Sequence, residues 1–182
     1  MTRQDLLNLK NGRVVVVLDA ETTGFYPDAG DEIIELAAEK LINRQVVDTF
    51  HAFISPSRSV PADAIAVHGL DDFFLKKHGE EAAVIFPRFA RFIEEAMLVG
   101  HNIRRFDYYF LTAHFARLNL PRPANDILDT LELARAILSL PNYKLATVAA
   151  HFDISTTGAH RAMADVVMTR EILLRLWPKR FP

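Results

Sequence analysis

The pattern of hydrophobic and polar positions has its strongest feature near the start of the chain, at Val14–Leu18. Four valines and a leucine follow one another there without an intervening polar residue. A continuous run of β-branched residues indicates a strand that is buried on both faces, as in the centre of an α/β sheet. Asp19 and Glu21 come directly after this run, and a polar turn follows over 22–24. The pattern therefore predicts a central strand that carries two acids at its carboxyl end.

Further strands are predicted on both sides of a central helical region. Asp31–Asn43 is ambiguous, because its Ala, Glu and Leu content favours a helix. The segment leads through a polar turn into Val46–Ile54, which is rich in Val, Phe and Thr and ends at a Ser-Pro-Ser turn. We favour a hairpin with one Ala/Glu-rich strand and keep the helix as the alternative. Met97–Val99 and Ile127–Leu128 are predicted as short strands.

Helical patterns occupy most of the middle of the chain. Ser59–His68 is predicted as a short helix, with a proline near its first turn and a glycine just beyond its end. The polar stretch Asp71–Glu81 is predicted as a loop. Pro87 suits the first position of a helix that runs to about Ala96.

The second half of the chain is predicted to be mainly helical. The expected helices are Ile103–Asn119, Thr130–Leu138, Leu145–Phe152 and a final one that carries Met163 to Trp177 and ends at Pro178. Residues 1–12 suggest one helical turn before the central strand. No internal repeat, low-complexity tract or linker interrupts the pattern, so the chain is predicted to form a single domain.

Composition and charge limit the classes of protein that fit this pattern. With 182 residues the chain can bury roughly 70% of its unfolded surface, and its apolar fraction of 50% is that of a globular protein. No apolar run approaches the ~20 residues of a membrane span, the start lacks the apolar region of a signal peptide, and cysteine is absent. We expect a cytoplasmic protein with no membrane partner. The net charge of −2 argues against broad coating of a polyanion but leaves room for a local groove.

The two acids after the central strand point to a metal. Asp19 and Glu21 are two residues apart, so in an extended chain their side chains lie on the same face of the sheet. Ligand sites in α/β sheets lie beyond the carboxyl ends of strands. Two carboxylates this close repel each other, and one would hold a proton unless a cation lay between them. Either residue alone would be an ordinary turn cap or a solvated acid, whereas the pair favours a divalent metal.

Two further acidic positions follow later in the chain. Asp107 is predicted one turn into the helix after Met97–Val99, with Asn102 as candidate N-cap, and by itself it would be an ordinary first-turn acid. His160 and Asp165 are five residues apart, which places them about 140° around a regular helix. They can share a site only if His160 precedes the helix, in the loop after Gly158.

Taken together, these positions resemble a known set of motifs. Asp-x-Glu-Thr-Thr-Gly at 19–24, Gly-His-Asn-x-x-x-Phe-Asp at 100–107 and His-Arg-Ala-x-x-Asp at 160–165 resemble the three motifs of the DEDDh (DnaQ-like) 3′–5′ exonucleases. Val67–Leu70 and Asp129–Leu131 are similar to secondary signatures of that family. The closest likeness is to exonuclease domains of the bacterial DNA polymerase III epsilon type.

The resemblance implies a ribonuclease-H-like α/β fold, a mixed sheet of about five strands flanked by helices. A single exonuclease domain would span 1–182, with a core of about 13–176, and Asp31–Asn43 would be a strand. Two divalent ions, Mg²⁺ or Mn²⁺, are implied. By similarity Asp19, Glu21 and Asp165 bind the tighter ion, Asp107 holds the second with Asp19 bridging, and His160 is the general base.

The implied reaction is stepwise release of 5′-mononucleotides from the 3′ end of a single-stranded nucleic acid, with DNA favoured. The residues implied in substrate binding are Thr22, Thr23, His68, Leu70 and Asn102. Arginine and lysine side chains that could meet phosphates are Arg104, Arg105, Lys144 and Arg161.

Several questions stay open at the level of sequence. The chain could instead be an RNA-directed relative, such as an oligoribonuclease or a tRNA-trimming enzyme. Such an enzyme distinguishes RNA from DNA by contacting the 2′-hydroxyl, and no residue of the sequence indicates that contact. A non-catalytic module that binds nucleic-acid ends is disfavoured by the complete set of acids and histidine. A DNA polymerase is a candidate partner, although the chain ends at Pro182 without the segment that holds the polymerase in the epsilon subunit. Both a monomer and a homodimer are compatible with the sequence.

Overall fold

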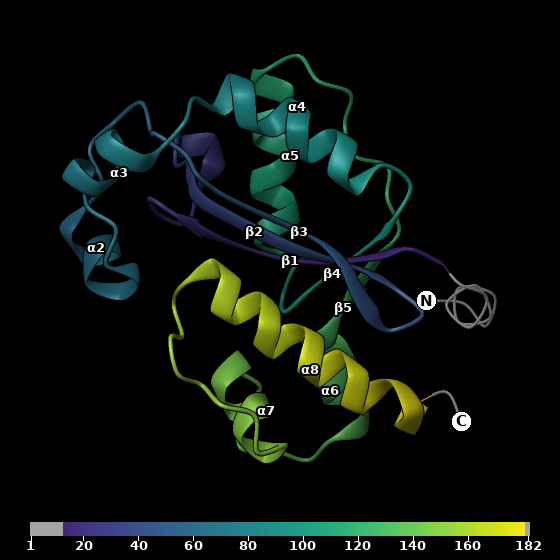
Figure 1. Ribbon diagram of the computed structural model, residues 1–182. Helices are drawn as coiled ribbons and strands as arrows, with labels where there is room; N and C mark the ends of the chain where they lie inside the picture. Colours follow the sequence, from purple (N-terminus) through teal and green to yellow (C-terminus); the bar gives the residue numbers. More distant parts are fainter. Residues whose placement is uncertain (1–12, 181–182) are drawn as a thin grey trace.

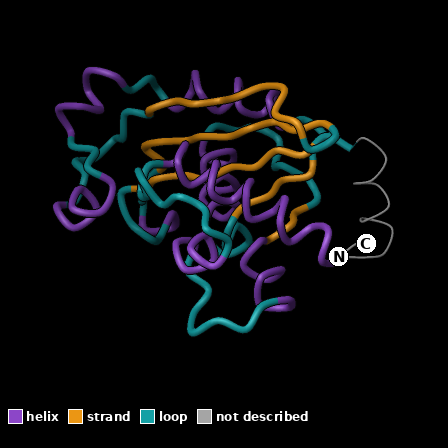
Figure 2. Tube along the Cα trace, turned by 60° about the horizontal axis from the view of Figure 1, so that its bottom comes forward, coloured by secondary structure: helices purple, strands orange, loops and turns teal. Residues whose placement is uncertain are grey.

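A computed structural model describes residues 13–180, and a five-stranded sheet runs through the middle of this part of the chain (Figure 1). The helical turn suggested for residues 1–12 lies outside the described residues. The strands are β1 (Val15–Thr22), β2 (Ile33–Ile42), β3 (Gln45–Phe53), β4 (Met97–Gly100) and β5 (Ile127–Asp129). They lie side by side in the order β3-β2-β1-β4-β5. The turned view in Figure 2 shows the strands gathered in one layer.

The sheet is mixed, and β1 lies at its centre. β1 pairs antiparallel with β2 and parallel with β4, while β2 and β3 form an antiparallel hairpin. The ambiguous segment is therefore a strand. Leu36 and Ala38 of β2 belong to the hydrophobic core on one face of the sheet, and Ala37 and Leu41 belong to the core on the other. Burial on both faces thus outweighs the local helix preference of Ala, Glu and Leu.

Helices cover both faces of the sheet (Figure 1). They are α2 (Ala62–His68), α3 (Asp72–His78), α4 (Ala82–Ile93), α5 (Asp107–Arg117), α6 (Thr130–Ile137), α7 (Leu145–His151) and α8 (Ala162–Arg180), with a short 3₁₀ helix, η1 (Pro27–Ala29). α4 and α5 lie over one face and α6 to α8 over the other, while α2 and α3 lie beyond one end of the sheet. Within residues 13–180, no helix has the length and apolar character to cross a membrane.

The two hydrophobic cores divide the side chains of β1 between them. Val16 and Leu18 pack under α4 and α5, whereas Val15 and Val17 pack with Val166 of α8. Successive side chains of a strand point to opposite faces. Odd-numbered residues of β1 therefore face α8.

Two predictions in the region 71–96 are wrong. Asp72–His78 forms α3 instead of a loop, and its N-terminus is capped by the Asp71 side chain, which accepts a hydrogen bond from Phe74 N at 2.7 Å. α4 begins at Ala82 and continues through Pro87 instead of starting there. The helix tolerates the proline because burial of Phe86 and Phe89 offsets the lost backbone hydrogen bond.

The boundaries of two other helices also differ from those predicted. α5 begins at Asp107 with Phe106 as its N-cap, so Asn102 is not the cap. The backbone of Asn102 is left-handed, with φ 67, and its N–H donates to Asp129 Oδ1 at 2.9 Å. The segment 101–106 thus forms turns held by Asp129. α8 continues to Arg180, past the end predicted at Pro178.

Candidate active site

Three carboxylates meet where the end of β1 lies against the start of α8. Asp19 and Glu21 are odd-numbered residues of β1 and face α8, whose first turn carries Asp165. One ligand oxygen from each of the three lies within 4.8 Å of the others. Residues that are far apart in the sequence thus form one site, with the separation that a shared cation requires.

Asp107 reaches the same strand end from α5. Its side chain is 3% exposed, and Oδ1 accepts a hydrogen bond from Ala20 N, between the two acids of β1, at 3.1 Å. The negative charges of Asp107 and Asp165 help to raise the pKa of Asp19. All four predicted acids are therefore neighbours, although Asp107 lies outside the group of three.

Burial and mutual repulsion make ionisation of these carboxyl groups unfavourable. Burial, followed by the repulsion of Asp107 and Asp165, raises the pKa of Asp19 well above its usual value. Burial and then Asp165 raise the pKa of Glu21 from 4.5 to about 8, and burial raises the pKa of Asp107 from 3.8 to about 7. A bound cation would relieve this repulsion.

The donor set fits a divalent cation. Oδ1 of Asp165 is buried and has no hydrogen-bond partner among the described residues. A buried carboxylate oxygen without a partner is unfavourable unless a cation or a proton satisfies it. Carboxylate oxygens are also the ligands that hard cations such as Mg²⁺ prefer.

His160 meets the geometric condition for sharing the site with Asp165. It precedes α8 and is exposed, and its backbone N–H donates to Asp165 Oδ2 at 3.3 Å. Its φ of 65 is left-handed, which is uncommon for a residue other than glycine. The turn at His160 therefore brings a loop histidine and a helix acid together, which a regular helix would not do.

The predicted substrate-binding residues divide into two groups. Thr22, Thr23 and His68 line a cleft of ≈ 460 Å³ together with Glu21. Leu70 is 2% exposed and Asn102 lies in the turns before α5, and neither lines this cleft. Three of the predicted residues therefore lie in one cleft with Glu21, whereas Leu70 and Asn102 lie outside that cleft.

Four basic residues were suggested to contact phosphates, and two of them already bind other groups of the protein. Arg105 and Lys144 are exposed, while Arg104 donates to Ile127 O at 2.6 Å. Arg161 binds the Glu35 carboxylate through Nε at 3.0 Å and through a second nitrogen at 3.2 Å. Arg161 therefore has a structural partner.

Glu35 of β2 is a member of this region that the sequence analysis missed. It is fully buried, lies opposite Glu21 in the strand register, and accepts hydrogen bonds from His51 at 2.7 Å and from Ala162 N at 3.3 Å. Burial alone would raise the pKa of Glu35, but the hydrogen bonds from His51 and Arg161 outweigh it and lower the pKa. Glu35 therefore links β2, β3 and the start of α8. A single acid among the apolar residues 33–38 is the signal that could have found it.

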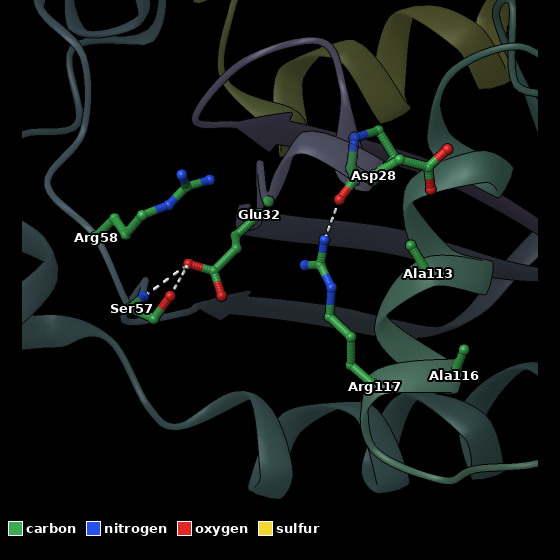
Figure 3. A pocket seen from close by; sticks show the side chains of 9 residues that line it. Asp28, Glu32, Ser57, Arg58, Ala113, Ala116 and Arg117 are labelled. Atoms are coloured by element: carbon green, nitrogen blue, oxygen red, sulfur yellow. Dashed lines mark hydrogen bonds between the residues drawn. The ribbon is translucent and has the colours of Figure 1, made fainter.

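A second cleft, of ≈ 500 Å³, lies between η1 and α5 (Figure 3). Its two arginines are engaged with backbone carbonyls: Arg58 donates to Ala29 O at 3.1 Å, and Arg117 donates to Pro27 O. None of the four acids lines it. We therefore place the candidate active site at the acid cluster and the adjoining cleft.

Comparison with known sequences identifies the family. The profile of the exonuclease family RNase_T matches residues 16–173. DNA polymerase III PolC-type from Caldanaerobacter subterraneus subsp. tengcongensis is 37% identical over 165 residues, which cover 90% of this chain but 12% of that protein. The corresponding polymerase of Halalkalibacterium halodurans is 38% identical over 162 residues, covering 88% of this chain and 11% of the polymerase. The chain thus spans only a small part of these relatives.

Solved structures share the fold. An exonuclease I structure superposes with a TM-score of 0.83 at 23% identity, over 93% of this chain and 43% of that one. E. coli exonuclease I in complex with a dT13 oligonucleotide gives a TM-score of 0.83 at 22% identity, over 93% and 42%. A zinc-bound complex of the same enzyme with single-stranded DNA gives 0.85 at 22%, over 93% and 41%. The predicted ribonuclease-H-like fold is confirmed, and the chain belongs to the RNase_T exonucleases, the DEDDh (DnaQ-like) family that its motifs resemble.

Proposed function

We propose that this exonuclease is metal-dependent and removes 5′-mononucleotides stepwise from the 3′ end of single-stranded DNA. The observation that carries the proposal is the convergence of Asp19, Glu21 and Asp165 within 4.8 Å, beside a cleft that Glu21 also lines. The named relatives are DNA polymerases, and the solved neighbours include complexes with DNA oligonucleotides, which favours DNA over RNA.

The proposed cofactors are two divalent ions, Mg²⁺ or Mn²⁺. Asp19, Glu21 and Asp165 would hold one ion, and Asp107 with Asp19 would hold the second. When bound, such ions lower the pKa of water and stabilise charge on the departing 3′ oxygen. The four carboxylates supply the negative charge that attracts the ions.

His160 is proposed as the general base that takes the proton from the attacking water. Its imidazole is exposed on the loop before α8, and its backbone is fixed to the Asp165 carboxylate. Histidine is a common general base, and at this position a proton that it takes up can pass to the solvent.

The test is a degradation assay with 5′-labelled single-stranded DNA, mismatched duplex DNA, long RNA and very short RNA, each with Mg²⁺ and with Mn²⁺. A 5′-labelled ladder that shortens progressively indicates 3′–5′ direction, and chelation of the metal should abolish it. Asp107→Asn and His160→Ala should each slow the reaction about 10²-fold, as expected for loss of a positioned acid–base or ligand group. Rates within a factor of about two of wild type would contradict these roles.

The same assay separates the remaining alternatives. Preference for short RNA would indicate an oligoribonuclease-like enzyme, and binding without metal-dependent cleavage would indicate a non-catalytic end-binding module. Because the relatives are replication polymerases, we also propose a cytoplasmic location and association with a DNA polymerase. The single domain over 1–182, and a monomer or homodimer, stay predictions.

A further inference from the structure

Glu35 is a buried acid that lies beside the acid cluster without belonging to it. It is fully buried in β2 and lies opposite Glu21 in the strand register. Among the described residues, the group of carboxylates that could share one cation does not include Glu35. Its negative charge helps to raise the pKa of Glu21, after burial and Asp165. Because this charge opposes ionisation of the cluster, Glu35 must supply something that an apolar residue would not.

Both oxygens of Glu35 are occupied by hydrogen-bond donors. Oε1 accepts from His51 at 2.7 Å and from Arg161 Nη2 at 3.2 Å. Oε2 accepts from Arg161 Nε at 3.0 Å and from Ala162 N at 3.3 Å. The guanidinium thus meets the carboxylate through two bonds, a geometry that fixes direction as well as distance. With both oxygens engaged, Glu35 is poorly suited to bind a cation itself.

The contacts of Glu35 hold the turn on which His160 lies. Arg161 follows His160 directly, and Ala162 is the first residue of α8. The first amides of a helix have no partner within the helix, and Glu35 provides one for Ala162. His160 itself has a left-handed backbone, with φ 65, and its N–H donates to Asp165 Oδ2. A turn in such a conformation persists only when surrounding contacts fix it.

The neighbouring segments do not fix this turn to the sheet. The loop at 155–159 precedes it, and the hydrogen bonds described for this loop join its residues to one another. The body of α8 is held separately, because Val166 and Leu173 pack against the sheet in the hydrophobic core. Glu35 is therefore the attachment between the sheet and the turn at His160, whereas α8 has attachments of its own.

A second ion pair joins the same two elements and allows a comparison. Nε of Arg170 in α8 lies 3.4 Å from Oε2 of Glu39, a buried residue of β2. Glu39 lies opposite Val17 of β1, whereas Glu35 lies opposite Glu21 at the cluster. Both acids thus connect β2 to α8, but only Glu35 contacts the start of the helix. Comparing the two separates attachment of α8 from placement of the turn before it.

We propose that Glu35 is a positioning residue for hydrolysis, which holds His160 beside Asp165 by fixing Arg161 and the first amide of α8. This inference rests on the proposed function, because it takes His160 as the general base. A buried ion pair often adds no more stability than well-packed apolar residues would, and its best-attested use is to select one geometry. Here the geometry selected is that of the turn at His160.

The test compares Glu35→Met with Glu39→Met in hydrolysis of a 5′-labelled oligothymidylate at saturating Mg²⁺. Methionine is as long as glutamate and fills a buried space, but its thioether accepts hydrogen bonds only weakly. The side chains of Arg161 and His51 are 42% and 37% exposed, so both can bind water once the carboxylate is gone. Urea unfolding of each variant verifies that it is folded.

The expected result is a loss of kcat confined to the acid at the turn. The kcat of Glu35→Met should fall about ten- to hundredfold, since a displacement of about 1 Å at a reacting group can cost 10²-fold. KM should stay near that of wild type, because the residues that line the cleft are unchanged. Glu39→Met should keep the kcat of wild type.

A double-mutant cycle tests whether Glu35 acts through His160. In a His160→Ala background, Glu35→Met should change kcat by less than about twofold, because no base is left to position. The inference is overturned if folded Glu35→Met has the kcat of Glu39→Met, or if it loses the same factor with and without His160.

Arg161→Lys provides a second variant in case Glu35→Met does not fold. It leaves Glu35 in place and keeps the positive charge, but lysine cannot form the paired bonds of a guanidinium. Its kcat should therefore fall as well, and a kcat equal to that of wild type would overturn the inference.

Amide hydrogen exchange separates failure of this inference from failure of the proposed function. With the metal chelated, the Ala162 amide should lose protection in Glu35→Met and keep it in Glu39→Met, whether or not the protein cleaves DNA. A wild-type protein that leaves the oligothymidylate intact would refute the proposed function. Unchanged protection of Ala162 in Glu35→Met would refute the anchoring of the turn by Glu35.

Discussion

Replacing Glu21, one of the proposed metal ligands, by glutamine is expected to stabilise the metal-free protein at high pH. The pKa of Glu21 is raised from 4.5 to about 8 in the folded protein, first by burial and then by repulsion from Asp165. The folded state thus binds a proton more tightly than the unfolded chain does between these two values. Stability is therefore greatest below the lower value, declines as the pH rises, and reaches its minimum above the higher one.

The size of the effect follows from the two pKa values. Each unit of pKa difference corresponds to 1.36 kcal/mol, so the charged Glu21 side chain lowers the free energy of unfolding by about 5 kcal/mol above pH 9. The same linkage gives about 3 kcal/mol at pH 7 and about 1 kcal/mol at pH 5. Between pH 5 and pH 9 the Glu21→Gln variant should therefore gain about 4 kcal/mol relative to wild type. The cost of burying the glutamine side chain in the variant is the same at every pH, so it cancels in this difference.

The assay is urea unfolding with the metal chelated, at several pH values across this range. Glu95→Gln serves as control, since Glu95 is exposed and its variant should follow wild type at every pH. Adding Mg²⁺ at high pH should raise the free energy of unfolding of the wild-type protein but not that of Glu21→Gln. Only the folded wild-type site is expected to bind the ion tightly. The reasoning is refuted if the two variants show the same dependence on pH.

Other predictions concern the neighbours of the cluster. Glu35→Ala should lower the free energy of unfolding by about 2 kcal/mol in urea titrations, because it removes a buried carboxylate that accepts hydrogen bonds from His51, Arg161 and the backbone of Ala162. An effect below about 1 kcal/mol would contradict the linking role of Glu35. Gly24→Ala should lower the free energy of unfolding by about 1–3 kcal/mol, because the added methyl group clashes with the Asp31 carboxylate. Gly79→Ala cannot serve as the control, because its methyl group would clash with Leu75 O and Ser55. His160→Gly should raise the free energy of unfolding by about 1 kcal/mol, because glycine adopts the left-handed backbone at this position without strain. The rate of hydrolysis should fall at the same time. Unchanged thermal stability would argue against strain at His160.

The sequence was most informative where burial determines the structure. Val14–Leu18 predicted the central strand because a continuous β-branched run has few alternatives in a globular protein. The alternation of side chains along that strand then placed Asp19 and Glu21 on one face. Asp31–Asn43 could not be decided from its own residues, because its helix preference is local and its burial on both faces depends on partners far away in the chain.

Local signals failed where a side chain from elsewhere determines the backbone. Asn102 has the character of an N-cap, yet the carboxylate of Asp129 holds its N–H and moves the start of the helix to Asp107. Pro87 has the character of a helix start, but burial of neighbouring aromatic residues carries the helix through it. These departures depend on tertiary contacts that no window of sequence contains.

The candidate site shows the same division. Asp19, Glu21, Asp107 and Asp165 could be chosen from motif spacing, because each is an acid at the end of a strand or in the first turn of a helix. Glu35 belongs to none of these motifs, and its partners Arg161 and Ala162 are distant in the sequence.

The position of Asp165 on the last helix has a consequence for biosynthesis. A growing polypeptide displays Asp19 and Glu21 early, but the third carboxylate reaches them only after α8 has been made and has docked across the sheet. Until then the two early acids lack the partner that completes the proposed ion site. A nascent chain in which α8 has not yet been made should therefore be unable to attack nucleic acid around the ribosome.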